Sequence, residues 1–357
     1  MINFKKSEID VKNPCEVCSV VDVNKDGILD IICGEYWYQG PDFKVKHKIS
    51  DIEHDGNYLH DFSDYPMDVT GNGYPDIITG SWWDEGLYWR ENPGPAGGEW
   101  KTHKIMELTN VETIRYYDID GDGEVEIFPN CPNEPVFFVK LKDGVFTKYV
   151  IGDVNAGHGL GVGDIDNDGK PEVITPAGIL HMPEDGPYAG LWKISEQIEL
   201  PNGCSVPILI HDVNGDGLPD IIAASGHNYG LAWYEQGSEN GKKVWKEHII
   251  DNAWSQYHDI QLADINGDGK LEVVTGKRWL AHNGSDPGDD GEVFVCYYTI
   301  RDTDRFYRHI IDYGSPLKGH SGVGLYFWLE DLNNNGMLDI IAPGKEGLYI
   351  FFNEGEL

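Results

Sequence analysis

The sequence predicts an all-β fold, a seven-bladed β-propeller with four-stranded blades, in a single domain spanning residues 1–357. Three observations support it. A nine-residue acidic motif occurs seven times, its copies are spaced like propeller blades, and short strand patterns between the copies alternate with Gly, Asn and Pro turns. Regular self-similarity at about 40–50 residues is typical of propellers.

The repeated motif is Asp-x-[Asp/Asn/Thr]-x-[Asp/Asn]-Gly-x-x-[Asp/Glu]. Successive copies start 46, 50, 46, 48, 52 and 67 residues apart, so one insertion precedes the last blade. The seven copies start at Asp22, Asp68, Asp118, Asp164, Asp212, Asp264 and Asp331.

Each unit contains four strand patterns in the same order. An apolar strand enters the acidic loop and a second strand leaves it, as in Asp76-Ile-Ile-Thr. A third is aromatic, as in GLYWREN from Gly86, and a fourth carries Trp-Lys-x-His-x-Ile, as at Trp100. The last unit lacks a fourth strand after Phe352. We therefore expect residues 3–10, which resemble that strand, to complete blade seven and remove its open edge.

Charge and composition limit the partners. Asp and Glu outnumber Lys and Arg by 61 to 27, a net charge of −34, which would repel nucleic acid and anionic membranes. The N-terminus shows no apolar signal-peptide core and no run is long enough to span a membrane, so a cytoplasmic protein is expected. The 6 cysteines are expected to be reduced thiols, and a monomer is the default for a closed propeller.

On these repeats the chain resembles the FG-GAP/VCBS repeat propellers over nearly its whole length. The resemblance implies the fold. It does not imply an activity, because function depends on the site that a fold carries.

The acidic loops predict several structural Ca²⁺ ions. Side-chain oxygens at positions one, three, five and nine, with a turn-forming Gly at six, suit a hard cation that takes six to eight oxygens. The alternative is an acidic turn held by Asx hydrogen bonds alone. The loops from Asp68 and Asp331 carry fewer charges and are expected to bind weakly or not at all. The expected ligands are Asp22, Asn24, Asp26, Asp30, Asp68, Asn72, Asp76, Asp118, Asp120, Asp122, Glu126, Asp164, Asp166, Asp168, Glu172, Asp212, Asn214, Asp216, Asp220, Asp264, Asn266, Asp268, Glu272, Asp331, Asn333, Asn335 and Asp339.

A candidate site lies on the opposite face. Because each acidic loop joins a first strand to a second, residues before first strands and after second strands meet on the other face, around the axis. Candidate catalytic residues there, or on the channel side of first strands, are His60, Glu112, Arg115, His158, His227, His258, Lys277, Arg278 and His320. Candidate substrate-binding residues are Tyr36, Trp37, Tyr65, Trp82, Trp83, Gln261 and Trp279.

These residue types suit two chemistries. Trp and Tyr stack on sugar rings, while His and Glu transfer protons. Alternatively, two or three imidazoles on the axis would hold one divalent transition metal that polarises a carbonyl. The imidazoles that recur in the fourth-strand motif, by contrast, are expected to be structural; they are His47, His103, His248 and His309.

Two segments, SWWDEGLYWRENPGPAGGEWKTHKI and NVETIRYYDIDGDGEVEIFPN, resemble the propeller domain of the aldos-2-ulose dehydratase and anhydrofructose dehydratase group. This resemblance implies a lyase that removes water or an alcohol from a keto-sugar or keto-glycoside, a small sugar-derived substrate. The chain ends at Leu357, without the additional C-terminal domains of the fungal members, so a second, isomerase-type step is not expected. The alternative is a non-catalytic propeller that binds carbohydrate or protein, as lectins and integrins do.

Overall fold

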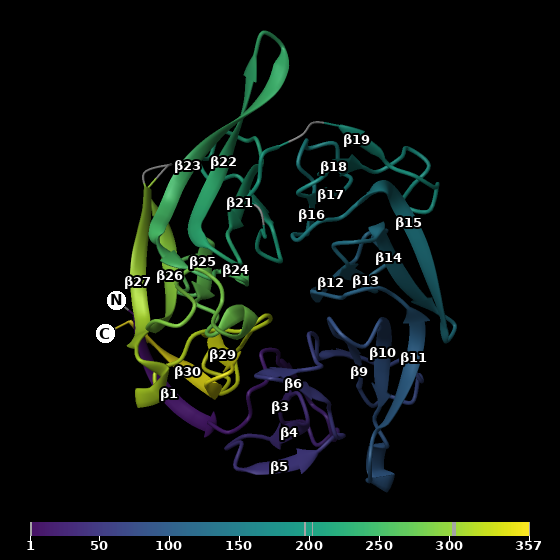
Figure 1. The fold of residues 1–357 in the computed structure, drawn as a ribbon, viewed down its shortest axis with the longest axis vertical. Coiled ribbons are helices and arrows are strands. Elements are labelled where there is room, and N and C mark those ends of the chain that lie inside the picture. The colour runs from purple at the N-terminus through teal and green to yellow at the C-terminus, as the bar shows by residue number, and fades with distance from the viewer. Residues whose placement is uncertain (1, 196–197, 202, 302–304, 357) are drawn as a thin grey trace.

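The computed structural model describes residues 2–195, 198–201, 203–301 and 305–356. The described residues form seven four-stranded antiparallel sheets arranged in a ring around a central axis, with one additional two-stranded hairpin (Figure 1). The predicted seven-bladed propeller is confirmed.

Blades one to four follow the chain in order. Blade one contains β2 (Ser19–Val21), β3 (Asp30–Cys33), β4 (Tyr36–Gln39) and β5 (Val45–Lys48). Blade two contains β8 (Tyr65–Met67), β9 (Asp76–Gly80), β10 (Gly86–Glu91) and β11 (Lys101–Glu107). Blade three contains β12 (Thr113–Tyr117), β13 (Glu126–Asn130), β14 (Pro135–Lys142) and β15 (Val145–Asn155). Blade four contains β16 (Gly161–Gly163), β17 (Glu172–Thr175), β18 (Gly178–His181) and β19 (Lys193–Ser195).

Blades five to seven complete the ring. Blade five contains β20 (Leu209–His211), β21 (Asp220–Ala224), β22 (Tyr229–Glu239) and β23 (Lys242–Ser255). Blade six contains β24 (Ile260–Ala263), β25 (Glu272–Gly276), β26 (Val293–Arg301) and β27 (Arg305–Gly314). Blade seven contains β28 (Trp328–Glu330), β29 (Asp339–Gly344), β30 (Gly347–Glu356) and β1 (Ile2–Asp10).

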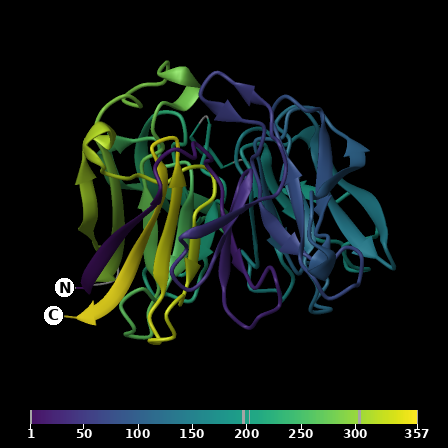
Figure 2. The same ribbon diagram turned by 90° about the horizontal axis from the view of Figure 1, so that it is seen from below.

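The N-terminal strand closes blade seven, as predicted. β1 pairs antiparallel with β30, placing Phe4 opposite Asn353 and Lys6 opposite Phe351. The two ends of the chain therefore lie side by side in one sheet (Figure 2). Among the described residues, no helix is long and apolar enough to cross a membrane.

The core lies between neighbouring blades, where apolar residues of successive sheets interdigitate. In the cluster between blades five and six, for example, Trp233, Tyr257 and Phe294 are buried together. The fourth-strand imidazoles cover the outer side of the sheets, and their structural role is confirmed. Each ring stacks on an aromatic ring of the third strand, in the pairs His47–Trp37, His103–Trp89, His248–Trp233 and His309–Tyr297.

Each acidic loop joins the first and second strands of its blade, so all seven lie on one face. The ninth position begins the second strand and is buried in every blade. In blade one, for example, Asp30 Oδ2 accepts the N–H of Val23 at 3.0 Å and Asp30 Oδ1 accepts the N–H of Gly40 at 2.9 Å. The ninth carboxylate thus ties the loop to its own sheet.

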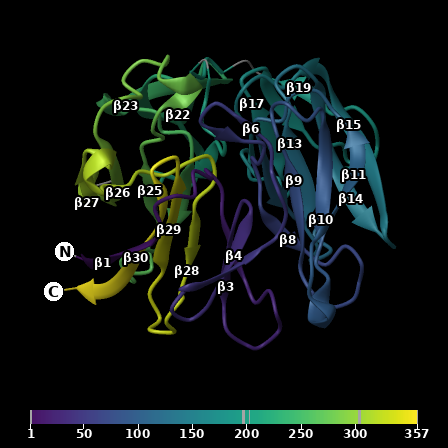
Figure 3. The same ribbon diagram turned by 60° about the horizontal axis from the view of Figure 1, so that its bottom comes forward.

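Two connections rise from the opposite face. The hairpin of β6 (His54–Asp55) and β7 (Tyr58–Leu59) precedes blade two, and the segment with the 3-10 turn η2 (Ala281–Asn283) joins β25 to β26. They lie side by side at that end of the molecule (Figures 2 and 3). Two further 3-10 turns among the described residues are η1 (Gly94–Ala96) and η3 (Pro316–Lys318).

Candidate metal centre on the axial face

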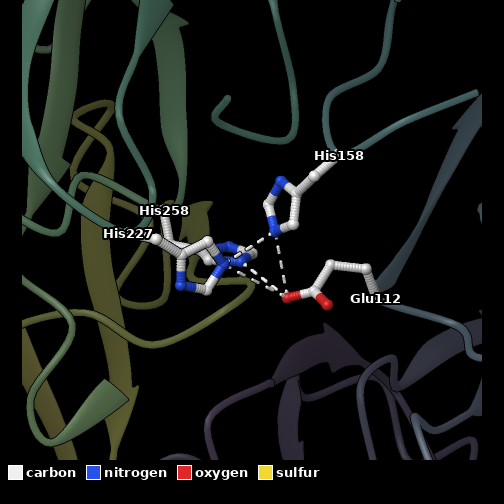
Figure 4. Close-up of side chains that lie close together, drawn as sticks. All are labelled: Glu112, His158, His227 and His258. Atoms are coloured by element: carbon white, nitrogen blue, oxygen red, sulfur yellow. Dashed lines mark hydrogen bonds and ion pairs between the residues drawn. The ribbon is translucent and has the colours of Figure 1, made fainter. Parts of the chain in front are cut away.

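Four side chains from four successive blades converge near the axis (Figure 4). Glu112 immediately precedes β12, His158 precedes β16, His227 follows β21 and His258 precedes β24. Glu112 Oε1 lies 3.1 Å from the Nε2 atoms of both His158 and His258, and 3.8 Å from that of His227. All four were predicted as site residues, and the structure brings them together.

Outer partners fix two of the imidazoles. Nδ1 of His158 lies 2.6 Å from the carbonyl oxygen of Cys204, and Nδ1 of His227 lies 2.7 Å from Asp286 Oδ2. A carbonyl and a carboxylate only accept hydrogen bonds, so both Nδ1 atoms carry the proton. In its neutral form each ring therefore presents an unprotonated Nε2 to the centre, the arrangement typical of metal-ligating histidines.

The centre needs a positive charge between these nitrogens. The Nε2 atoms of His158 and His227 are 2.9 Å apart. Two unprotonated nitrogens at that distance repel unless an additional proton or a metal ion lies between them. Ligand atoms bonded to one ion at about 2.1 Å lie about 3.0–3.4 Å apart across an octahedral or tetrahedral edge. The two separations of 3.1 Å from Glu112 to His158 and His258 fall in that range and the 2.9 Å between His158 and His227 lies just below it, whereas the 3.8 Å between Glu112 and His227 is wider.

The electrostatics differ among the imidazoles when no metal is bound. Burial lowers the pKa of His227, but hydrogen bonds to Asp286 and Glu112 outweigh it, so the pKa of His227 rises above its ordinary value. Burial lowers the pKa of His258 well below its ordinary value, so this ring is neutral. Burial raises the pKa of Glu112, but positive charge and hydrogen-bond donors on the facing imidazoles outweigh it, so the pKa of Glu112 falls well below its ordinary value. The centre thus attracts positive charge, which protons supply in the absence of a metal, and a bound metal ion would displace those protons because its ligands must be deprotonated.

A pocket opens beside Glu112. Its volume is about 220 Å³. Aromatic side chains of Tyr58, Phe62, Trp82 and Trp83 form one part of its wall, and Glu112, Arg278, His282 and Asn283 form the rest. The predicted aromatic residues Trp82 and Trp83 therefore do lie at the site, next to the carboxylate of the centre.

A buried ion network supports the polar side of this pocket. Arg278 is 2% exposed and donates from Nε to Glu16 Oε1 at 2.8 Å and from Nη2 to Glu16 Oε2 at 3.2 Å. The ammonium of Lys345 lies 3.8 Å from Glu16 Oε2. Two cations thus share one carboxylate, which leaves this side of the pocket locally positive in a strongly acidic protein.

Sequence comparison identifies the repeats. A model of the FG-GAP-like repeat matches residues 118–175 and 212–275. Each match runs from the acidic loop of one blade, three or five, to the second strand of the next. These two segments of the propeller are similar to FG-GAP-like repeats. Among curated proteins, none matches the sequence.

Solved structures resemble this propeller in fold. The exotype rhamnogalacturonan lyase YesX is 12% identical with a TM-score of 0.54, covering 96% of this chain and 72% of its own. BBS1N, solved in complex with ARL6DN, is 11% identical with a TM-score of 0.57, covering 98% of this chain and 95% of its own. The V. cholerae biofilm matrix protein Bap1 is 12% identical with a TM-score of 0.41, covering 95% and 77%. At these identities the likeness concerns the fold alone.

Three predicted catalytic residues lie away from the centre of the propeller. His60 pairs through Nδ1 with Asp84 at 2.7 Å and faces a separate cavity of about 270 Å³. His320 pairs with Asp312 at 2.7 Å near the junction of blades six and seven. Lys277 is buried among acidic groups, and burial lowers its pKa.

Other predicted residues line the channel below the centre. Arg115 is held by Asp259 at 2.9 Å and stacks on Tyr326, with 3.8 Å between the guanidinium carbon and the ring centre. Gln261 donates to the carbonyl of Phe327 at 2.7 Å. Tyr65 stacks on Tyr116 in the same channel. Contacts within the protein therefore explain the positions of these three side chains, and no bound ligand is needed to explain them.

The remaining predicted substrate-binding residues, Tyr36, Trp37 and Trp279, are not among those lining the pocket. Trp37 is packed in the core against His47, and Tyr36 lies beneath the ammonium of Lys46 at 4.1 Å.

The third acidic loop brings carboxylate oxygens close enough together to bind one cation. One carboxylate oxygen each of Asp118, Asp120 and Asp122 lies within 4.8 Å of the others. The first residue also accepts backbone N–H groups, as an Asx-type turn would, both in this loop, where Asp122 and Gly123 donate to Asp118 at 3.1 and 2.9 Å, and in loop one, where Asp26 and Gly27 donate to Asp22 at 3.0 and 2.8 Å. Calcium therefore remains a prediction for these loops.

Sequence reasoning missed the residues that the two raised connections contribute. Tyr58 comes from the β6–β7 hairpin, while His282, Asn283 and Asp286 come from the segment between β25 and β26. One signal could have found the second group, because the spacing of 67 residues between the last two motifs marks blade six as the place of an insertion.

Proposed function

We propose that Glu112, His158, His227 and His258 bind one divalent transition metal, and that the protein is a carbohydrate-active lyase. Its reaction would be the elimination of water or an alcohol from a keto-sugar or keto-glycoside. The observation that carries the proposal is the 2.9 Å contact between two Nε2 atoms whose rings hold their protons on the opposite nitrogen. Imidazole and carboxylate together suit Zn²⁺, Fe²⁺, Mn²⁺ and similar ions.

The pocket supports a sugar as substrate. Aromatic faces of Trp82, Trp83 and Tyr58 offer the flat apolar surface on which the C–H face of a sugar ring packs. Arg278 and Asn283 offer donors to oxygen atoms on the other side. A pocket with an apolar wall and few polar groups is typical of small-molecule sites.

The proposed reaction depends on the carbonyl group of the keto-sugar. A divalent metal held by the four residues would act as a Lewis acid and polarise the oxygen of that carbonyl. The proton of the neighbouring C–H bond would pass to Nε2 of His282, whose Nδ1 proton is held by Asp286. The C–H electron pair forms the enolate, and the C–O bond of the leaving group breaks as the C=C double bond forms. The leaving oxygen takes up a proton, so water or an alcohol departs. In this chain, the guanidinium of Arg278 stabilises negative charge at the pocket, and His282 and Tyr58 are the imidazole and phenol that line it for proton exchange.

A non-catalytic binding propeller is the second candidate. Its support is the aromatic wall, which would also serve a lectin. A binding site, however, does not require three imidazoles and a buried carboxylate to share one point beside that wall, and this convergence favours the lyase.

Metal analysis tests the proposal first. Protein purified without added metal and exchanged into metal-free buffer is expected to hold about one transition-metal ion per chain, as a four-ligand site predicts. The double variant His158→Ala/His258→Ala should lose it, while His103→Ala/His248→Ala, which removes two outer-strand imidazoles, should keep it.

Turnover tests the reaction itself. The metal-loaded protein should convert a methyl keto-glycoside to an unsaturated ketone with release of methanol, and the His158/His258 variant should not. A protein that contains the metal but binds the keto-glycoside unchanged would support the binding propeller. A protein without a transition metal would overturn the metal centre.

A further inference from the structure

The two raised connections meet directly above the pocket. The backbone N–H of His282 donates to Tyr58 Oη at 2.6 Å, and the N–H of Asn57 donates to Asn283 Oδ1 at 3.4 Å. The hairpin belongs to the connection between blades one and two, and His282 belongs to blade six. These contacts therefore join segments from different sides of the ring across the axial face (Figure 3). We call this pair of segments, residues 54–59 and 280–286, the roof.

The roof is anchored from below. Lys345 donates to the carbonyl of Leu280 at 2.6 Å, and its ammonium lies 3.5 Å from the centre of the Tyr58 ring. Lys345 is held in turn by Glu16, which also binds Arg278. One buried ion network thus fixes both halves of the roof and the arginine of the pocket wall.

The roof segment of blade six also has a defined backbone shape. Leu280, His282 and Asn283 adopt left-handed φ angles of 49°, 45° and 56°. Such angles are unfavourable for residues other than glycine, and they persist only where surrounding contacts hold them. Here the contacts to Tyr58, Lys345 and, through the His282 side chain at 2.8 Å, Asp286 hold them. The segment is therefore a fixed part of the pocket wall.

The space beneath the roof is small. Sites for drug-sized ligands usually measure about 300–1,000 Å³, whereas this pocket measures about 220 Å³. Its aromatic wall comes from blade two and the hairpin, and its polar wall comes from blade six and Glu112. A polysaccharide bound through an internal ring needs a groove that is open at both ends. The hydrogen bond between Tyr58 and His282 instead joins the two walls of the pocket to each other.

We propose that the site accepts one sugar ring at a time, a keto-monosaccharide or the terminal ring of a glycoside, and excludes the interior rings of a polysaccharide. The inference rests on the proposed function. It adds that Tyr58 and Asn283 determine substrate length through the roof, and that the ring lies between Trp83 and Arg278 with its carbonyl toward Glu112.

Calorimetric titration of the metal-loaded protein tests this. The probes are a methyl keto-glycoside and a four-ring oligomer whose keto group is on an internal ring. The oligomer should bind at least about tenfold more weakly, the loss expected when one aromatic stacking contact is not made. The double variant Tyr58→Phe/Asn283→Ala removes both roof hydrogen bonds and should reduce the difference in affinity between the two probes. Tyr149→Phe, a control in the outer strand β15, should leave it unchanged.

The outcomes separate the two proposals. Equal binding of both probes, or a difference that the roof variant does not alter, would overturn the one-ring inference. Binding of neither probe by a protein that holds one metal ion per chain would overturn the inference and leave the metal centre intact. Loss of the metal centre itself, seen as wild-type protein without a transition metal, would overturn both.

Discussion

A single carboxylate outside the proposed metal centre determines how His227 faces it. Asp286 Oδ2 accepts the Nδ1 proton of His227 at 2.7 Å, which leaves Nε2 free to bind a metal. We expect Asp286→Asn to weaken metal binding about 10–100-fold, the usual effect of removing such a partner. Competition with a chelator measures it. Asp84→Asn is the matched control, because Asp84 makes the same 2.7 Å contact to His60 away from the centre. Equal effects of the two variants would contradict the assignment.

A second prediction at the residue scale concerns pH. Burial, opposed by the N–H of Gly322 and aided by the charge of Glu16, raises the pKa of Glu346 from 4.5 to about 7. A folded-state pKa above the unfolded value means that this group stabilises the fold fully below about pH 4.5 and loses that contribution as pH rises through about 7. Above pH 7 the loss is of the order of 3 kcal/mol.

The variant Glu346→Gln removes this ionisation and retains an oxygen for Gly322. Urea unfolding at pH 8 should show it more stable than wild type by up to about 3 kcal/mol, and at pH 4.5 the difference should vanish. Glu354→Gln changes an exposed carboxylate and should show no such trend. A stability difference that does not depend on pH would mean that burial of the ionised group is not the cause.

At the scale of the structural elements, the third acidic loop holds a lysine ammonium among its carboxylates. The ammonium of Lys140, from β14, donates to Asp120 and Asp122 at 2.7 Å and to Glu126 at 2.6 Å. These are the oxygens that a calcium ion would use. We expect Lys140 to replace calcium in this loop.

Lys140→Met should therefore make blade three depend on calcium. With a chelator present, the variant should melt several degrees below wild type, since about 1–3 kcal/mol is lost when a buried charged partner is removed. Added calcium should recover more stability in the variant than in wild type. Lys148→Met, which removes a 2.7 Å pair with Glu134 in the turn before β14, should not change the calcium response. An equal response in both variants would contradict the substitution of lysine for calcium.

The elements also show where sequence reasoning succeeds. The acidic motif fixes strand order, so it predicted which side chains share the axial face, and all four converging residues were among them. Strand periodicity could not distinguish channel residues that contact a ligand from channel residues that contact one another. Arg115, for example, forms an ion pair with Asp259. The roof residues Tyr58 and His282 lie outside the repeat, in backbone held by long-range contacts. No local pattern marks Tyr58, and only the long spacing before the last motif points to the segment of His282.

At the scale of the whole molecule, the ring is closed by hydrogen bonding between the two ends of the chain. β1 pairs with β30 along its length, and Lys6 binds both Asp312 and the carbonyl of Gly319 in the connection from blade six. Closure therefore joins blades six and seven as well as the termini. A propeller whose ring is open exposes a long edge strand and the apolar side chains beneath it.

Removal of residues 1–10 should destabilise the whole protein. Ile2 and Phe4 pack against the core between blades six and seven, and losing two such side chains costs about 3–6 kcal/mol. Because each blade packs on its neighbours, we expect one cooperative transition at a lower temperature instead of local fraying, measured by calorimetry. A synthetic peptide of residues 1–12 should restore the melting temperature in proportion to its concentration, since it binds only the folded ring. The same peptide with Lys6→Glu, which repels Asp312, should restore less. An unchanged melting temperature after truncation would show that pairing between the ends does not hold the ring together.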